Sequence, residues 1–133
     1  MQSVYRSFDV RLPKSNNGSL ADKEVYTVVQ PDICVICDPE KIDERGCKVA
    51  PDLVVEILSK NTSQKDLKDK YEVYEQSGIS EYWVIHPYEA TALVYKLNPE
   101  GKYLAGPLLT IGDTLSTDML PRLVISMEEV FQD

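Results

Sequence analysis

The stretch PDLVVEIL, residues 51–58, has the composition of a buried β-strand but carries an acid in its middle. Glu56 lies between the apolar residues Val55 and Ile57. An unpaired carboxylate in a core is strongly destabilising. Glu56 must therefore reach solvent, pair with a cation or bind a metal ion.

The composition describes an acidic chain of ordinary domain size. Its 133 residues are 43% hydrophobic and 27% charged, with a net charge of −8, which suits one domain with its own core. The chain has no apolar run long enough for a membrane span and no secretory leader at its start, so we expect a soluble, cytoplasmic protein. The charge disfavours non-specific duplex binding, but an acidic metal site can still meet a phosphate through bound cations.

The cysteines do not form a convincing metal or disulfide motif. Cys34, Cys37 and Cys47 are an odd number, and the C-x-x-C pair lies on or beside a predicted strand, where an offset of three points to opposite faces. His86 is the one histidine. We therefore interpret the cysteines as buried or half-buried thiols and not as zinc ligands.

One helix stands out, over residues 61–78. Its buried stripe starts at Leu67 and recurs at i+4 and i+7. Either Thr62 or Ser63 can cap the amino end of the helix, and Gly78 lies where the helix should stop. Strands are expected at residues 4–11, 24–37 (one long or two short), 51–59, 81–87 and 91–97, then short strands after residue 101 and a short helix at 127–132. Residues 12–23 are predicted as a loop and 38–50 as a polar connection. The strand–helix–strand order around the helix predicts a parallel pair within a mixed α/β sheet.

The pattern of carboxylates suggests a metal site. Alternation places Asp52 and Glu56 on one face of their strand, and Asp32 starts another strand. If the two strands are neighbours, Asp32 and Glu56 approach each other, and two carboxylates are a common protein contribution to a magnesium site. Each aspartate follows a proline, however, and could be a turn residue; for Asp52 we favour that alternative.

Lys70 flanks the buried stripe of the helix, about 60° from Leu67 at 100° per residue. Its ammonium group could extend toward a carboxylate of the neighbouring strand. Alternatively, Lys70 pairs with Asp66 at i, i+4 on the helix surface. Residues 59–70 carry further lysines and form a locally basic stretch.

Two segments resemble a known family. The segments are VVQPDICVICDPEKIDERGC (28–47) and APDLVVEILSKNTSQKDLKDKYEVYEQSGISEYWVIHP (50–87). Both are similar to a family of restriction endonucleases first catalogued as a domain of unknown function, within the PD-(D/E)XK nuclease superfamily. The resemblance covers about residues 8–97 and is carried by the PD…E-x-L-S strand, the D-x-x-x-K-x-x-x-Y helix and the G-I-S-E-Y-W segment. It implies a restriction-endonuclease-like fold, hydrolysis of DNA phosphodiester bonds with Mg²⁺ (Mn²⁺ substituting), and a homodimer.

The resemblance also implies roles for individual residues. Asp32 matches the first acidic metal ligand and Glu56 the second, with the backbone carbonyl of Ile57 as a further ligand. Leu58 replaces the usual lysine two residues after the glutamate, and Lys70 resembles a migrated replacement for it.

Asp66 matches another position of the family and would orient Lys70. Asp52 is a further candidate for a supporting role.

The chain departs from the family pattern at its start and at His86. Family members usually have a longer N-terminal helical region, so residues 1–133 are expected to form a single domain without it, as a natural short form or a fragment. His86 occupies the acidic position of the family's V-x-D-P segment. The alternative function is therefore a catalytically silent domain of the same fold that binds a partner or itself.

Overall fold

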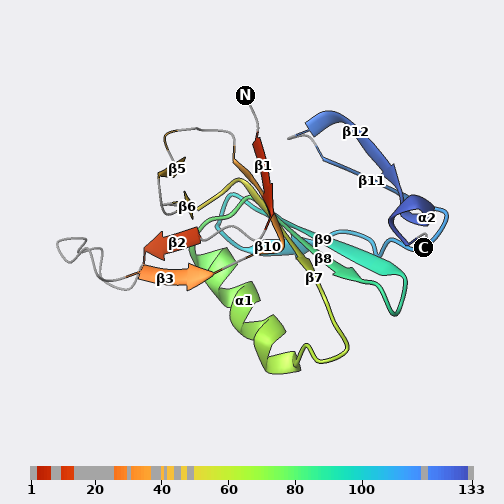
Figure 1. The fold of residues 1–133 in the computed structure, drawn as a ribbon, viewed down its shortest axis with the longest axis horizontal. Helices are drawn as coiled ribbons and strands as arrows, with labels where there is room; N and C mark the ends of the chain where they lie inside the picture. Colours follow the sequence, from red (N-terminus) through yellow and green to blue (C-terminus); the bar gives the residue numbers. More distant parts are fainter. Residues whose placement is uncertain are drawn as a thin grey trace.

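The computed structural model describes residues 3–6, 10–13, 26–29, 31–36, 40, 42–43, 46–47, 50–117 and 120–131 (Figure 1). The strands are β1 (Ser3–Arg6), β2 (Val10–Pro13), β3 (Tyr26–Val29), β4 (Ile33–Ile36), β5 (Ile42–Asp43), β6 (Gly46–Cys47), β7 (Leu53–Ile57), β8 (Glu81–His86), β9 (Thr91–Leu97), β10 (Tyr103–Ala105), β11 (Thr114–Thr117) and β12 (Leu120–Ser126). The helices are α1 (Gln64–Gln76) and α2 (Met127–Val130). Across the described ranges, neither helix combines the length and the apolar composition that a membrane crossing requires.

A six-stranded mixed sheet in the order β1-β4-β7-β8-β9-β10 forms the centre of the fold. β7 and β8 are parallel, whereas the other neighbouring pairs of this sheet are antiparallel. Helix α1 connects the two parallel strands, so the predicted βαβ unit and the α/β class are confirmed. β2, β3, β5 and β6 form a second sheet, and β11 pairs with β12 in a third.

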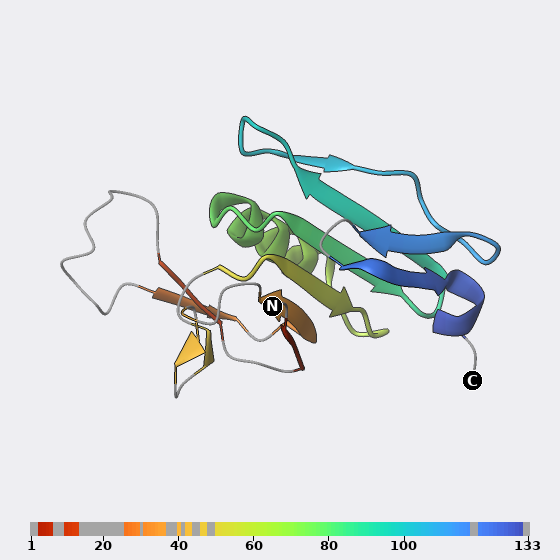
Figure 2. The same cartoon turned by 90° about the horizontal axis from the view of Figure 1, so that it is seen from above.

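Both faces of the central sheet are covered, by different elements (Figure 2). On one face, Val54 packs with Tyr74 of α1 and with Val10 of β2 in one hydrophobic cluster. On the other, Val55 packs with Leu115 of β11 in a second cluster, which also contains Met127 of α2. The alternation of β7 therefore divides its residues between the two clusters, as predicted, and the Val54 side is also the side of Glu56.

Helix α1 begins and ends at the residues that its capping signals indicate. Ser63 is the N-cap, and its side chain accepts a hydrogen bond from the Asp66 backbone N–H at 3.0 Å. Gly78 has a φ of +78°, a conformation that favours glycine, just beyond the last turn. The helix is thus shorter at both ends than the predicted range 61–78, which included its capping residues.

We predict that Ser63→Ala lowers the free energy of unfolding by about 1 kcal/mol, because it removes the acceptor for an otherwise unpaired N–H in the first turn. Urea denaturation followed by circular dichroism measures this difference. Ser80→Ala is a suitable control, since Ser80 is exposed and outside the helix, and its effect should stay within about 0.5 kcal/mol. An equal loss in both variants would contradict the capping role.

The N-terminal half differs from expectation in its connections. The single strand expected at 4–11 is two strands, β1 and β2, in different sheets, and the second continues to Pro13. The segment 24–37 contains two short strands, with the non-strand residue Pro31 before the second. The polar connection 38–50 contains β5 and β6. Leu12 and Pro13 of the predicted loop 12–23 belong instead to β2. Residues 14–23 of that loop and the predicted orientation of Cys37 lie outside the described residues.

Candidate active site

Glu56 lies near the end of β7, buried between the sheet and α1. Its side chain is 4% exposed, yet both carboxylate oxygens have a donor. The Lys70 ammonium lies 3.1 Å from Oε1, and the Tyr74 hydroxyl donates to Oε2 at 2.5 Å. Of the three alternatives for this acid, the structure excludes exposure to solvent and establishes a cation partner.

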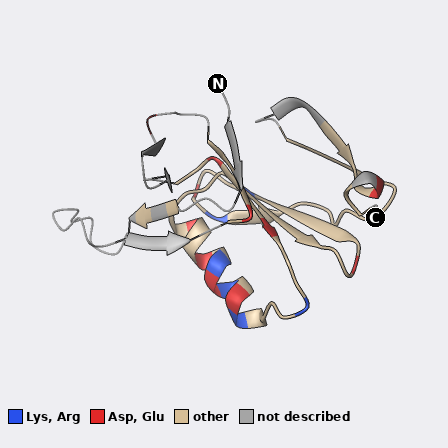
Figure 3. Ribbon diagram, in the orientation of Figure 1, with Lys and Arg blue, Asp and Glu red and all other residues tan. Residues whose placement is uncertain are grey.

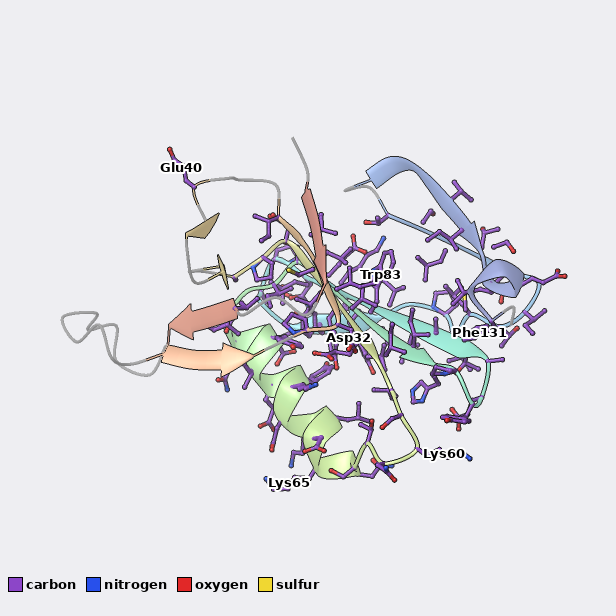
Figure 4. The ribbon with its side chains drawn as sticks, viewed as in Figure 1. Asp32, Glu40, Lys60, Lys65, Trp83 and Phe131 are labelled. Carbon is purple, nitrogen blue, oxygen red and sulfur yellow. The ribbon has the colours of Figure 1, made fainter. Side chains whose placement is uncertain are left out.

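Asp32 lies beside Glu56 because their strands are neighbours. β4 and β7 are antiparallel, with Ile33 opposite Val55. Continuing this register by one residue brings Asp32 opposite Glu56, and directly opposite residues share a face of the sheet. The half-buried Asp32 accepts a hydrogen bond on Oδ2 from the backbone N–H of Ile57 at 2.7 Å. In Figure 4, Asp32 lies at the centre of the molecule, whereas Lys60 and Lys65 project at its periphery.

Lys70 reaches the site from the side of α1 that faces the sheet. Its side chain is 41% exposed, and its ammonium reaches the buried Glu56 carboxylate, as a long lysine side chain at the edge of an apolar stripe can do. The ion pair is with Glu56 and not with Asp66, which is exposed in the first turn. Charged residues of both signs occur along α1 (Figure 3), and the exposed Lys65 pairs with Asp69.

Burial dominates the electrostatics of the site. Burial raises the pKa of Glu56 above its usual value, and the nearby Asp32 charge adds to the rise, while Tyr74 and Lys70 act to lower it. Burial and the Glu56 charge raise the pKa of Tyr74 well above the usual tyrosine value. The Tyr74 hydroxyl therefore keeps its proton at any ordinary pH and remains a donor to the carboxylate.

The oxygen donors present suit a hard cation such as Mg²⁺. The Ile57 backbone N–H donates to one oxygen of Asp32. Glu56 accepts from the Tyr74 hydroxyl on one oxygen and from the half-exposed Lys70 ammonium on the other. Among the described residues, no group of three or more acidic, histidine or cysteine side chains could hold a metal ion. Any Mg²⁺ would therefore take only these two carboxylates from the side chains described, and the rest of its shell from water, substrate or a backbone carbonyl.

The hydrogen bonds given below for the remaining predicted positions do not settle their roles. Ile57 ends β7, and the role of its carbonyl stays a prediction. Asp52 is half-buried just before β7, where its N–H donates to Val35 and its carbonyl accepts from Glu81, as a residue of a structured bend does. The supporting roles of Asp52 and Asp66 stay predictions.

The sequence pattern does not predict two polar contacts of buried residues. It places Tyr74 in the hydrophobic stripe of the helix, although a tyrosine at a buried position usually has a partner for its hydroxyl. Glu81 is a second buried carboxylate, 5% exposed, on the opposite face of the sheet. It accepts hydrogen bonds from the Trp83 indole at 2.9 Å and the Thr117 hydroxyl at 2.6 Å, so it ties β8 to β11.

A pocket of about 320 Å³ lies beside the site, at the carboxyl ends of β7 and β8. It is lined by Leu58, Ser59, Lys60, Thr62, Gln64, Leu67, His86, Pro87, Tyr88 and Glu89. The Lys60 ammonium lies 4.9 Å from the centre of the exposed Tyr88 ring. The crevice at the carboxyl ends of parallel strands is where α/β sheets commonly bind ligands.

The fold and the site together define a restriction-endonuclease-like α/β protein with a buried carboxylate–lysine pair. Residues 9–128 match the Uma2 family, described as "Putative restriction endonuclease", and the chain belongs to this family. A similar solved structure is that of a "putative nuclease" of DUF820 from Anabaena variabilis, with a TM-score of 0.69 and 21% identity over 98% of this chain and 68% of that one. At that identity the likeness shows a shared fold. No curated protein matches the chain.

Proposed function

We propose that this protein is a metal-dependent endonuclease that hydrolyses DNA phosphodiester bonds, with Asp32 and Glu56 as ligands of Mg²⁺ and Lys70 as the catalytic lysine. The observation that carries the proposal is the buried Glu56 carboxylate, held 3.1 Å from Lys70 and opposite Asp32 in the sheet. Membership of a family described as restriction endonucleases supports the same reaction.

In the proposed reaction, a water oxygen attacks phosphorus and releases a proton to solvent, one P–O ester bond breaks, and the leaving oxygen takes a proton from solvent. Mg²⁺, when bound, polarises the phosphate and lowers the pKa of a bound water. Lys70 spans from solvent to Glu56, so its ammonium can move from the carboxylate to an incoming phosphate and offset the charge that develops there. Asp32 and Glu56 place two carboxyl groups at the position where the cation would bind.

The pocket beside the site offers a place for the rest of the nucleic acid. Lys60 can contact a phosphate, and the exposed Tyr88 ring can stack on a base. The whole chain has a negative net charge, so its overall charge does not attract DNA. Local contacts of this kind are therefore more important for binding.

The proposal includes a homodimer, which light scattering of the purified protein would test.

The test is nicking of supercoiled plasmid. We expect nicking with Mg²⁺ or Mn²⁺, no nicking with EDTA, and a loss of about 10³-fold in Asp32→Ala, because a metal ion supplies several kcal/mol of transition-state stabilisation. Glu100→Ala is the control, since Glu100 is exposed in the turn before β10, and it should nick at the wild-type rate. Nicking that persists undiminished in Asp32→Ala would overturn the assignment.

A catalytically silent domain is the second candidate, and one observation favours it. Lys70 and Tyr74 already satisfy both oxygens of Glu56, so the carboxylate is accommodated with protein groups alone. Divalent cations discriminate the two candidates, because a ligand of the folded state raises the melting temperature. A clear rise in Mn²⁺, absent from Asp32→Ala, supports the nuclease, whereas no change supports the silent domain.

A further inference from the structure

The two oxygens of Glu56 have donors of very different kinds. Oε1 faces the Lys70 ammonium, whose side chain is 41% exposed and can exchange its partner for water. Oε2 faces the hydroxyl of Tyr74, which is 0% exposed. A cation or a phosphate can therefore displace the first donor, whereas the second stays in place.

Packing fixes the Tyr74 hydroxyl. The ring lies in the core cluster between α1 and the sheet. It makes an edge contact with Tyr82, at 5.0 Å between ring centres and 73° between ring planes. Because the Tyr74 ring is attached to α1 and packs against the Tyr82 ring, it has little freedom to move. The direction of the hydrogen bond from its hydroxyl therefore determines the orientation of the Glu56 carboxylate.

Asp32 is held in the same way by a different donor. The Ile57 backbone N–H, fixed at the end of β7, donates to Asp32 Oδ2 at 2.7 Å. Each of the two carboxylates thus has one oxygen bound to a rigid donor. Within the described ranges, the second oxygen of each, Asp32 Oδ1 and Glu56 Oε1, has no rigid donor of this kind.

We propose that Tyr74 is a positioning residue of this site: its hydroxyl orients Glu56 through Oε2, so that Oε1 is presented to a divalent cation. This inference rests on the proposed metal-dependent function and adds to it a residue that would act through Glu56 without touching the substrate. Outer-shell hydrogen bonds of this kind commonly change metal affinity by about 10–100-fold.

Tyr82 supplies a matched control within the same cluster. It is also buried, at 1% exposure, and its hydroxyl has no hydrogen-bond partner among the described residues. Tyr74→Phe and Tyr82→Phe therefore remove the same atom from neighbouring buried rings, and only the first removal takes a bond from Glu56. Both replacements keep the ring, so both variants should fold, and Tyr82→Phe should melt at or above the wild-type temperature.

The experiment is calorimetric titration of the full chain with Mn²⁺, together with plasmid nicking. We expect Tyr74→Phe to bind Mn²⁺ about 10–100-fold more weakly and Tyr82→Phe to bind it within about twofold of wild type. Wild-type affinity in Tyr74→Phe, an equal loss in Tyr82→Phe, or no Mn²⁺ binding by the wild-type chain would each overturn the inference.

The two readouts separate this inference from the proposed function. A chain that binds Mn²⁺ in a Tyr74-dependent way but nicks no DNA keeps the positioning role and loses the nuclease. A chain that nicks DNA with Tyr74→Phe at full rate and full Mn²⁺ affinity keeps the nuclease and loses the positioning role.

Discussion

Glu56→Gln should reduce metal-dependent nicking by about 10³-fold, because it removes a charged ligand of the proposed cation, while it makes the metal-free protein more stable. The gain in free energy of unfolding at pH 7 should be about 1 kcal/mol, as is common when a functional group is removed from an active site. Glutamine fills the same space and accepts the Tyr74 hydrogen bond, but carries no charge into the core. Thermal and urea unfolding in EDTA measure the gain.

The stability gained by Glu56→Gln should depend on pH. The pKa of Glu56 is raised mainly by burial and to a smaller extent by the charge of Asp32, so Glu56 binds a proton more tightly in the folded protein than in the unfolded chain. Ionised Glu56 therefore costs stability above its folded pKa, and the cost disappears as the pH falls toward the usual value of 4.5. The advantage of Glu56→Gln should therefore shrink as the pH falls toward 4.5. A variant less stable than wild type at pH 7 would mean that the Lys70 pair outweighs burial.

Lys70→Met should lower the nicking rate by about 10²–10³-fold, the usual effect of removing one group that stabilises charge in the transition state. In metal-free buffer at pH 7 it should also lower the free energy of unfolding by about 1–2 kcal/mol, because Glu56 loses its cation. This is less than for a fully buried pair, since the lysine side chain is 41% exposed. Methionine keeps the apolar contacts of the lysine stem.

Lys68→Met is the matched control, as Lys68 is an exposed lysine on the same helix, and it should change neither quantity appreciably. A double-mutant cycle adds a second check: Lys70→Met should cost less stability in the Glu56→Gln background, because the charge that Lys70 compensates is already absent. Equal costs in both backgrounds would show that Lys70 acts on stability without Glu56.

The local elements were accessible from sequence because their signals are local. The period of α1, its cap at Ser63 and its end at Gly78 depend on neighbouring residues, and so does the alternation that divides β7 between the two hydrophobic clusters. The N-terminal half was harder to predict. β1 and β2 lie only a few residues apart but belong to different sheets, and no local pattern specifies which partner a strand will find.

For the site, the sequence alone predicts that Glu56 is an acid in a buried strand, that Asp32 begins another strand, and that Lys70 flanks the buried side of the next helix. Three features appear only in the folded chain: β4 is the neighbour of β7, Lys70 pairs with Glu56 and not with Asp66, and Tyr74 and Ile57 donate to the two carboxylates. The physical reason is that side-chain periodicity follows from backbone geometry within one element. Strand order and the choice of hydrogen-bond partner depend instead on how distant segments pack together to exclude water.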